Sequence, residues 1–600
     1  MDAVAGVAFG RNLYKLLAED AFDHQPIRGA GGRYLLVADA RIDNRDELLD
    51  TLRIDRAEAA VVSDAALLMR GWERWGVELH AHAIGDYALG AWDFEESSLT
   101  LLRSAFALKP LFYHVGPDFI AFASMPAGLH ALEAIPKRLD IEQAAAIAGQ
   151  FSYLGSSTIF KGIRQVRQGY AVRFRRGRED AFRLWEIERR APLFDSLDEY
   201  GEALRGELDK AVAARLRRHH GKVASQLSAG RDSSAVTASA ASLLAGRGED
   251  LLALTGAPHA GFQGSPIPGA LCDESDLAFV TASRSPNVRH VIVRPDAVSP
   301  IRKLETLNRL HHGPMINVSN LPWWFEVHQQ ACQRQAAIML ASSTGNFTIS
   351  AGGFRHFGDL LREEGLSSWL RSSLLFGGSS PSRWRSLLNV TLSPRMPRSI
   401  HRQLLKIFRR WQVSAFEVPV LKAPYRSVAE SRLREEWKDS RPPRSYFDFR
   451  REMLWNRDHP DKLSLALWGL DPRDPTSDRR VVELCFSVPA KFLVPGNSAR
   501  PLYDAAFAGR VASEVLNCPD RGLQSADWFD HFRKEDVRAA FQSYRQSALV
   551  REFFDLDYLD GIIEAWPRSG WERWQVRYTY RNLVLGTLGL ASFIHHHFPD

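Results

Sequence analysis

A short run of small and acidic residues in the first half of the chain has the composition of a phosphate-binding loop. Residues 223–227 form an apolar run of strand length, which ends abruptly at SAGRDSS, residues 228–234. An alanine-rich stretch with helical spacing follows. Small residues let a phosphate approach the backbone, and free N–H groups at a helix N-terminus favour an anion. The sequence therefore predicts a strand, a tight loop and a helix, with an anion site at the loop.

The loop lacks the residues of a Walker loop. No Gly-Lys-Ser or Gly-Lys-Thr follows it, so no lysine stands ready for a β- or γ-phosphate. The other interpretation of this stretch is an ordinary helix start, in which Ser228 or Asp232 only caps the helix. The loop alone leaves both interpretations open.

Length and composition restrict the class of protein. Six hundred residues exceed what one hydrophobic core supports, so we expect two domains or more. Apolar residues make up 45% of the chain and charged residues 25%, which is typical of soluble globular proteins. No apolar run approaches the roughly 20 residues of a membrane span, and the first residues do not resemble a signal peptide. We therefore expect a cytoplasmic protein that binds no membrane.

Structural metal sites and nucleic-acid binding are disfavoured as well. The four cysteines are scattered without a CxxC pair, so we expect reduced thiols and no structural zinc. His595, His596 and His597 predict a solvated tail. Arginine is dense between 384 and 451, but acidic residues interleave with it, which favours a salt-bridged helical face and no nucleic-acid partner. These acids are Glu430, Glu435, Glu436, Asp439 and Asp448.

The first 190 residues are rich in predicted strands. Short runs of apolar and aromatic residues lie between turn residues, and two packed antiparallel sheets would accommodate them. The predicted strands are 31–43, 89–94, 98–104, 110–116 and 119–124. Helical spacing occurs at 46–52 and 63–76. We predict an α+β domain over residues 1–190.

Strand and helix patterns alternate from residue 200 onward. The predicted elements are strands at 251–256, 288–293 and 337–340 and helices at 276–283 and 323–337. This order favours a parallel sheet that binds its ligand at the carboxyl ends of the strands. After about residue 355 the pattern is mostly helical. We predict an α/β domain with a helical C-terminal extension over residues 200–600.

Several phrases of the chain resemble those of asparagine synthetases. Residues 228–234 are similar to SGGxDS, the pyrophosphate loop of the ATP pyrophosphatases, and IMLASSTGNF at 338–347 is similar to MVLSGEGSDE. Residues 469–489 resemble GxExRxPFLDxxxVExAxxxP. GDYALGAWD at 85–93 resembles GxFAFAIWD of the glutamine amidotransferase domain, and that resemblance extends over most of residues 1–175. It implies an Ntn-type β-sandwich followed by an ATP-pyrophosphatase-like α/β domain.

The N-terminal resemblance fails at the residues that would release ammonia. The family's nucleophile is a cysteine at position 2, where this chain has Asp2, and a carboxylate cannot do thiolate acyl chemistry. The family's glutamine-holding phrase NGE is here Asp39, Ala40 and Arg41, and no cysteine lies in the first 190 residues. We infer that this domain keeps its fold, has lost ammonia release, and serves as structural support or contacts a substrate peptide.

The resemblance also implies nucleotide and metal residues. Asp232 and Asn346 would hold Mg²⁺, although Asn346 replaces an aspartate of the family and adds no negative charge. Ala229 replaces a glycine, which requires a negative φ at that position. The residues implied for ATP are Leu227, Ser228, Ala229, Gly230, Arg231, Asp232, Ser233, Ser234, Thr255, Gly256 and Gly345.

Asp232, Arg473 and Arg521 are the implied catalytic residues. Arg521 falls where the family places a lysine that stabilises the acyl-adenylate, and it could act as an electrostatic clamp but not as a base. Arg473 is either a guanidinium for a phosphate or carboxylate or a buried ion-pair partner. Asp273 and Glu274 either face ATP or cap a helix.

A synthetase without an ammonia source has to take its amine from elsewhere. Lasso-peptide cyclases and β-lactam synthetases do so, and three features resemble the cyclases more closely. These are the degenerate amidotransferase start, the Gly-Asn phrase at 345–346 with the run 348–350, and the cluster of Asn317, Asn320, Trp323 and Trp324. We predict an ATP- and Mg²⁺-dependent lasso peptide cyclase, which adenylates an Asp or Glu side chain of a precursor peptide and joins it to the N-terminal amine. A leader-binding protein and a leader protease are further candidate partners. An ammonia-dependent asparagine synthetase, a β-lactam synthetase-like small-molecule cyclase and a non-enzymatic precursor-binding scaffold stay open.

Overall fold

A computed structural model describes most of the chain, namely residues 6–106, 108–149, 155–264, 267, 269–311, 313–392, 418–439, 445–455, 462–496 and 498–598, without the side chains of 432–439. Asp2, at the predicted nucleophile position, and a large part of the arginine-dense stretch lie outside these residues. No helix among the described residues is long and apolar enough to cross a membrane.

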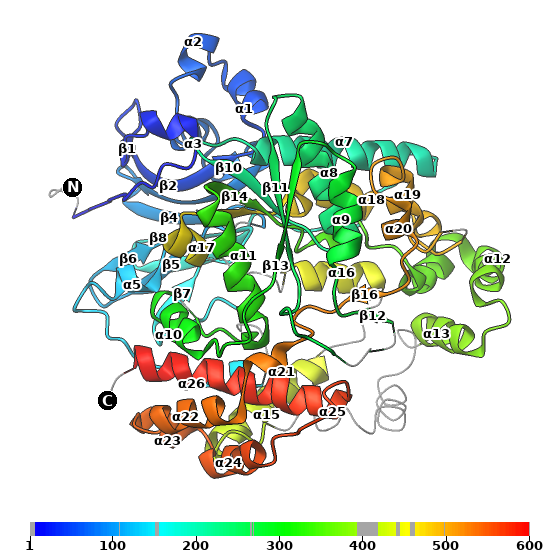
Figure 1. Cartoon of the computed structure of the whole chain (residues 1–600). Coiled ribbons are helices and arrows are strands. Elements are labelled where there is room, and N and C mark those ends of the chain that lie inside the picture. Colours follow the sequence, from blue (N-terminus) through cyan, green and yellow to red (C-terminus); the bar gives the residue numbers. More distant parts are fainter. Residues whose placement is uncertain are drawn as a thin grey trace.

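Two antiparallel sheets form the N-terminal part, as predicted (Figure 1). Their strand orders are β1-β2-β3-β4-β8-β9 and β6-β5-β7. The strands are β1 (Ile27–Arg28), β2 (Tyr34–Ile42), β3 (Gly85–Asp93), β4 (Ser98–Arg103), β5 (Phe112–Val115), β6 (Ile120–Ala123), β7 (Ile163–Gln165), β8 (Tyr170–Arg175) and β9 (Arg178–Arg183). Successive side chains alternate between the faces of a strand, so Leu101 packs towards the smaller sheet with Tyr113. Leu102 packs on the opposite face, with Leu68 of α3 (Asp64–Trp75).

Both helices predicted in this part are present. They are α1 (Arg45–Leu52) and α3, and α3 begins after Ser63, whose Oγ accepts a hydrogen bond from the Ala66 N–H at 3.2 Å. Strands β8 and β9 were not predicted, because their arginines and acids hide the alternation of apolar residues: β9 is exposed along most of its length.

A five-stranded parallel sheet forms the centre of the second part (Figure 1). Its order is β13-β11-β10-β14-β15, and every pair is parallel. The strands are β10 (Lys222–Gln226), β11 (Leu251–Gly256), β13 (Val288–Val293), β14 (Ala336–Leu340) and β15 (Asp471–Arg473). The sheet is covered by α7 (Leu197–Arg215), α8 (Arg231–Ala245), α9 (Ser275–Ser283), α11 (Leu321–Gln333) and α18 (Arg479–Ser487). Leu252 packs towards α11 with Val327, and Leu251 packs towards α8 with Val236, so both faces are buried.

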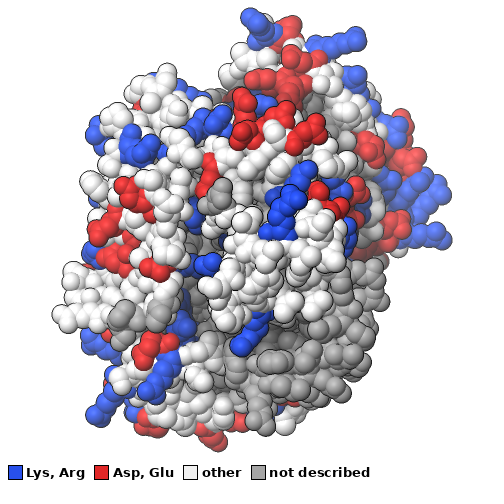
Figure 2. All heavy atoms as spheres, turned by 90° about the vertical axis from the view of Figure 1, so that its right-hand side faces the viewer, with Lys and Arg blue, Asp and Glu red and all other residues white. Residues whose placement is uncertain are grey.

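The remaining elements are mostly helical, as predicted. They are α10 (Ile301–Leu310), α12 (Phe357–Gly377), α13 (Pro381–Leu392), α15 (Ala423–Asp439), α16 (Tyr446–Trp455), α17 (Leu463–Trp468), α19 (Pro501–Phe507), α20 (Ser513–Leu516), α21 (Trp528–His531), α22 (Lys534–Tyr544), α23 (Ala548–Phe553), α24 (Leu556–Glu564), α25 (Trp574–Val576), the π-helical segment η10 (Arg577–Val584) and α26 (Leu585–His597). Charged side chains of both signs interleave on the face that carries α12 and α13 (Figure 2).

The predicted solvated histidine tail is wrong. His595, His596 and His597 end helix α26, which is buried along most of its length in the largest helical core. The Nε2 atom of His597 contacts the backbone carbonyl of Asn308. Burial lowers the pKa of His597 to about 4, so this ring is neutral in the folded protein. The run of histidines conceals the apolar character of the helix that precedes it.

Candidate active site

A wide pocket, which we call the main pocket, opens at the carboxyl ends of β10, β11 and β14. Its volume is about 1230 Å³, and it is lined by the loop after β10, by Gly256 to Pro258 after β11 and by Ser342, Ser343 and Asn346 after β14. Helix α8 points its N-terminus at the same place, because it begins at Arg231, inside the 228–234 segment. The position agrees with the ligand site predicted from the alternation of strands and helices.

The polar groups of the 228–234 loop bind one another. Ser228 Oγ lies 2.9 Å from Ser233 Oγ and accepts a hydrogen bond from the Gly230 N–H at 3.0 Å. Ser234 is buried behind the pocket and donates to the Gly230 carbonyl at 2.9 Å. Ala229 has no positive φ, as its Cβ requires. Gly230 is the N-cap of α8 and no side chain caps this helix, so the capping role considered for Ser228 or Asp232 is absent.

Glu274 contacts the loop directly. Its Oε1 accepts a hydrogen bond from the Ala229 N–H at 3.1 Å, and burial raises the pKa of this carboxyl. The carboxyl is packed against β16 (Arg521–Gly522), where a Cβ on Gly522 would lie 2.0 Å from Oε1. Asp273 instead accepts from the Ser275 N–H at 2.9 Å and pairs with Arg294 at 2.7 Å. Of the two acids, Glu274 lines the main pocket and Asp273 serves the helix start.

Asp232 has the properties of a ligand for a cation. Its Oδ1 is buried and has no hydrogen-bond partner among the described residues. Burial raises the pKa of the carboxyl to about 7, and the nearby charge of Asp474 acts in the same direction. Asn346 lines the same pocket. A carboxylate oxygen and an amide oxygen are hard donors that fit Mg²⁺, which keeps several waters and substrate phosphates in its shell. No cluster of three or more metal-ligating side chains occurs in the described part of the chain.

Four of the predicted site residues do not line the main pocket, namely Ser234, Gly345, Thr255 and Arg473. The side chains of two of them are engaged elsewhere. Thr255 is buried, and its Oγ1 lies 2.8 Å from His290 Nε2, so its side chain is not free to contact a nucleotide. Arg473 is buried, pairs with Asp471 at 2.7 Å and donates to two backbone carbonyls of residues 215 and 217. The structure therefore corrects the catalytic role given to Arg473 to its alternative, a buried ion-pair partner.

Three further predicted residues, Leu227, Arg231 and Arg521, line the main pocket in different ways. Leu227 lines the pocket while its N–H donates to the Leu254 carbonyl at 2.9 Å. Arg231 directs its guanidinium to the Leu516 carbonyl. Arg521 is exposed in the wall of the pocket, held by the pairing of β16 with β12 (Ala270–Leu271).

The cluster of Asn317, Asn320, Trp323 and Trp324 is divided between two environments. Trp323 lines the main pocket, and its ring covers Gly256, where a Cβ would lie 3.1 Å from the ring. Trp324 packs away from the pocket against Trp468, with ring centroids 5.4 Å apart. Asn320 donates to Gln524 at 3.2 Å and holds part of the pocket wall.

Arg500 lines the main pocket and was not predicted. Arg500 is half-buried, and burial lowers the pKa of its guanidinium. A Cβ on Gly353 would lie 2.6 Å from Arg500 Nη1, and Gly353 has a φ of +123°. The consecutive glycines 352 and 353 were the available signal, because two glycines between structured elements often mark a close approach.

Ion pairs fill the position of the glutamine-holding phrase. Asp39 pairs with Arg11 at 3.3 Å, with Lys109 at 3.8 Å and with Lys462. The charges of Lys109 and Lys462 hold the pKa of Asp39 well below its usual range although burial opposes this. The cavity beside Asp39 has a volume of about 10 Å³, which holds at most one water.

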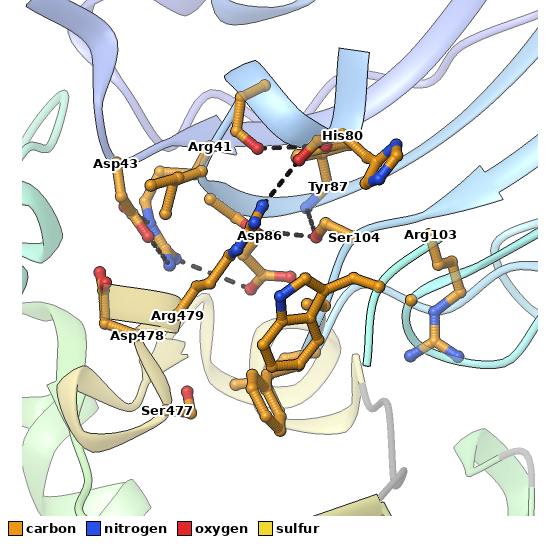
Figure 3. Close-up of a pocket in the computed structure, with 18 of the residues that line it drawn as sticks. Arg41, Asp43, His80, Asp86, Tyr87, Arg103, Ser104, Ser477, Asp478 and Arg479 are labelled. Carbon is orange, nitrogen blue, oxygen red and sulfur yellow. Dashed lines mark hydrogen bonds and ion pairs between the residues drawn. The ribbon is translucent and has the colours of Figure 1, made fainter. Parts of the chain in front are cut away.

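Arg41 is engaged in the same way (Figure 3). It pairs with Asp43 at 2.8 Å and lies 3.8 Å from Asp86, beside a cavity of about 30 Å³. Arg215 of α7 joins this group to the second part of the chain, because it pairs with Asp43 at 3.3 Å and with Asp478 at 2.9 Å. We call these pairs the interdomain ion-pair network, formed by Asp39, Arg41, Asp43, Lys109, Arg215, Asp471, Arg473 and Asp478.

Comparison with known proteins places both parts of the chain in families. Residues 5–185 match the glutamine amidotransferase domain, and residues 203–588 match asparagine synthase. Over 499 residues the chain is 23% identical to the glutamine-hydrolysing asparagine synthetase 3 of Bacillus subtilis strain 168, with 81% of this chain and 74% of that protein covered.

The likeness to solved structures is much weaker. The glutamine phosphoribosylpyrophosphate amidotransferase of B. subtilis, complexed with ADP and GMP, matches with a TM-score of 0.21, 14% identity and 46% of this chain covered. A structure of the allosteric regulatory enzyme of purine biosynthesis matches with a TM-score of 0.20 and the same identity and coverage. This chain spans 65% and 63% of those two chains, less than two thirds of each. TM-scores this low carry no weight for the fold.

The match to asparagine synthase covers more than half of the chain. It favours an enzyme over the non-enzymatic scaffold considered above, and the main pocket at the carboxyl ends of β10, β11 and β14 lies within the matched residues. The chain therefore belongs to the asparagine synthetase family of ATP-dependent, amide-bond-forming ligases, with a glutamine amidotransferase domain in front of the synthase domain.

Proposed function

We propose that this ligase is a lasso peptide cyclase. It adenylates an Asp or Glu side-chain carboxylate of a precursor peptide and joins that carboxyl to the peptide's own N-terminal amine. The observation that carries the proposal is the state of Asp39, which is tied to Arg11, Lys109 and Lys462 where the family holds glutamine. A ligase without glutamine needs another amine, and a peptide substrate carries one.

The size of the main pocket supports a large substrate. Its volume of about 1230 Å³ exceeds the roughly 300–1,000 Å³ of ordinary small-molecule sites. A cyclase also has to hold its peptide in a folded form, because ordering a chain costs about 1–2 kcal/mol per residue in backbone entropy. A roomy pocket with fixed walls can supply this order before the bond forms.

The residues of the pocket have distinct roles in the proposed reaction. The N–H groups in the first turn of α8, which no side chain caps, receive the phosphates. Asp232 and Asn346 would hold Mg²⁺, which neutralises phosphate charge. A carboxylate oxygen of the substrate bonds to the α-phosphorus as the bond to the pyrophosphate oxygen breaks. The amine nitrogen then bonds to the acyl carbon, AMP leaves, and the amine proton passes to solvent. Arg500 and Arg521 stabilise the developing negative charge.

The precursor peptide is the first proposed partner. A leader-binding protein and a leader protease are further proposed partners, since a precursor has to be delivered and trimmed before its N-terminal amine is free. ATP and Mg²⁺ are the proposed cosubstrate and cofactor.

An ammonia-dependent asparagine synthetase is the second candidate. The similarity to the B. subtilis asparagine synthetase favours it. It requires free aspartate as the acyl donor and ammonium as the amine source, and it makes no use of a peptide-sized pocket.

Pyrophosphate release decides between the two candidates. The purified protein is incubated with ATP and Mg²⁺ and either a synthetic Gly-led peptide with an internal Asp or Glu, or aspartate with ammonium chloride. We expect pyrophosphate and a peptide lighter by one water with the first pair only. Turnover with aspartate and ammonium alone would establish the synthetase, and release of glutamate from glutamine would refute both candidates.

A further inference from the structure

A second cavity lies beside the main pocket. This side chamber has a volume of about 760 Å³ and lies between the loop that follows β11, helix α21 and the segment 568–577. Cys272, Leu523, Ala526 and Arg581 line both cavities, so the two share a wall. A substrate held in the main pocket can therefore extend into the side chamber.

Aromatic rings form one wall of the side chamber. The rings of Phe529 and Trp571 are stacked with centroids 5.1 Å apart and planes 2° from parallel. Phe262 lies 6.0 Å from Phe529, on the loop after β11. These three side chains are half-buried and line the cavity, so they present apolar faces that the described residues do not cover completely. A side chain of similar character would gain stacking and apolar contact there.

Two arginines of the π-helical segment η10 lie at the end of this wall. Arg577 lines the side chamber, and its Nε is buried without a hydrogen-bond partner among the described residues. Among the described residues, Arg581 binds only neutral groups. It donates to Ser319 Oγ at 3.0 Å, to Asn320 Oδ1 at 3.1 Å and to the Gln524 carbonyl at 2.9 Å. Burial lowers the pKa of Arg581, and the neighbouring charge of Arg577 lowers it further.

Among the described residues, the two acidic side chains that line the chamber form no ion pair with these arginines. Asp530 pairs with His259 at 3.0 Å, and Glu572 is exposed at the rim. Two more arginines, Arg533 and Arg568, are exposed at the rim as well. The side chains that line the chamber therefore carry a net positive charge. An anion bound at the end of the apolar wall would reduce the repulsion between Arg577 and Arg581. A guanidinium binds a carboxylate through paired hydrogen bonds. π-Helical turns recur at functional sites.

We infer that the side chamber binds a segment of a peptide substrate that carries a large aromatic or aliphatic side chain next to a carboxylate. The carboxylate lies against Arg577 and Arg581, and the apolar side chain lies on Phe529 and Trp571. This inference rests on the proposed function, because it gives the peptide a second point of attachment beside the nucleotide pocket. Free aspartate lacks the apolar part and is too small to bridge the two cavities.

Binding of a defined probe tests the inference without any turnover. The probe is N-acetyl-fluorotryptophanyl-aspartate, observed by fluorine NMR with the full-length protein in the absence of ATP. Its counterpart N-acetyl-fluorotryptophanyl-asparagine amide has no charge. We expect the charged probe to bind at least tenfold more tightly, since charge-assisted hydrogen bonds contribute about 1.5–3 kcal/mol. Equal binding of the two probes would overturn the inference.

Matched variants locate the bound probe. Arg577→Ala and Trp571→Ala should each weaken binding about tenfold or more, and Arg577→Lys should retain part of it. Arg573→Ala and Trp574→Ala are the controls, because these side chains belong to the same segment and do not line the chamber. Melting temperatures show whether each variant folds. Unchanged binding in folded Arg577→Ala and Trp571→Ala, or loss of the probe on adding aspartate or AMP, would overturn the inference.

A separate assay keeps the two proposals apart. ATP–pyrophosphate exchange with a peptide reports on the main pocket and on the proposed function. If the probe binds through Arg577 and Trp571 while no peptide supports exchange, the proposed site in the side chamber is supported and the proposed cyclase function is contradicted. If peptides support exchange while the probe binds the Arg577 and Trp571 variants as tightly as the wild type, the proposed cyclase function is supported and the proposed site in the side chamber is contradicted.

Discussion

Gly345 lies against the side chain of Asp232, so closely that a Cβ on residue 345 would stand 2.3 Å from Asp232 Cγ. Real Cβ atoms do not approach other carbons to this distance, so an alanine would push the carboxylate out of its place. The turn after β14 thus fixes where the carboxylate at the start of α8 can stand.

We expect Gly345→Ala to lower the rate of pyrophosphate release about 100-fold, because a displacement near 1 Å of a reacting group has this effect. Gly206→Ala is the control, since a Cβ there meets nothing within 4 Å. Initial rates with saturating ATP and Mg²⁺ measure the difference. Wild-type rates in folded Gly345→Ala would show that Asp232 plays no part in the reaction.

Asp232 makes stability depend on pH. The pKa of its carboxyl is raised from 3.8 to about 7 by burial, so the folded protein holds a proton that the unfolded chain gives up. The contribution of this carboxyl to the free energy of unfolding is therefore fully present below about pH 4 and is lost as pH rises towards 7. Asp232→Asn removes this dependence and should be more stable than the wild type above pH 7, by at most about 4 kcal/mol. Urea unfolding across this pH range measures it.

Magnesium should reduce or reverse the difference in stability between Asp232→Asn and the wild type above pH 7. Because Mg²⁺ binds the ionised carboxylate, added Mg²⁺ should raise the melting temperature of the wild type above pH 7 and leave Asp232→Asn unchanged. An equal effect of Mg²⁺ on both proteins would place the ion elsewhere.

Glu274 should oppose the binding of phosphate. Its carboxyl accepts the Ala229 N–H that a phosphate could also use, and it brings a negative charge when ionised. Glu274→Gln keeps the acceptor oxygen and removes the charge, so Mg-pyrophosphate should bind several-fold more tightly to it at alkaline pH. The pKa of Glu274 is raised by burial, so the difference should shrink as pH falls and the wild-type carboxyl takes up a proton. Calorimetric titration at two pH values measures this, and tighter binding to the wild type would contradict it.

Arg215 should stabilise the fold far more than a surface arginine does. Arg215→Met leaves Asp43 and Asp478 short of one positive charge in a buried setting, which costs about 3–5 kcal/mol. Arg289→Met is the control, because Arg289 pairs with Asp250 on the surface at 3.0 Å and its loss should cost below about 1 kcal/mol. Urea midpoints of the two variants give the comparison, and equal midpoints would contradict a buried network.

Most of the sheets and the position of the pocket could be predicted from the sequence. Strands β11 and β14 are mostly apolar, as expected when both faces of a parallel sheet are covered. Strands β10 and β13 carry polar residues as well, but their apolar residues and the alternation of strands with helices still predict them. β15 could not be predicted, since it has three residues, contains Pro472 and follows β14 only after several helices. Its pairing, Ile338 with Asp471, is long-range.

The arrangement of side chains within the site was only partly accessible. The spacing of a loop predicts which residues are near the pocket, but not which way they point, so Thr255 and Arg473 were placed in it although both are engaged elsewhere. Arg500 and Arg577 come from segments with no motif, and only the fold brings them to the cavities. The consecutive glycines 352 and 353 were a signal for a close approach such as that of Arg500, whereas nothing in the sequence indicated Arg577.

The interdomain ion-pair network has a consequence for how such a protein can change. Asp43 belongs to one half of the molecule and its counter-ion Arg215 to the other, and neither is accessible to water. Should the front half be deleted, Arg215 would lose Asp43 and Lys462 would lose Asp39, while Asp471 would lose Lys109. Loss of the front domain would therefore destabilise the domain that remains, which favours inheritance of the two domains together.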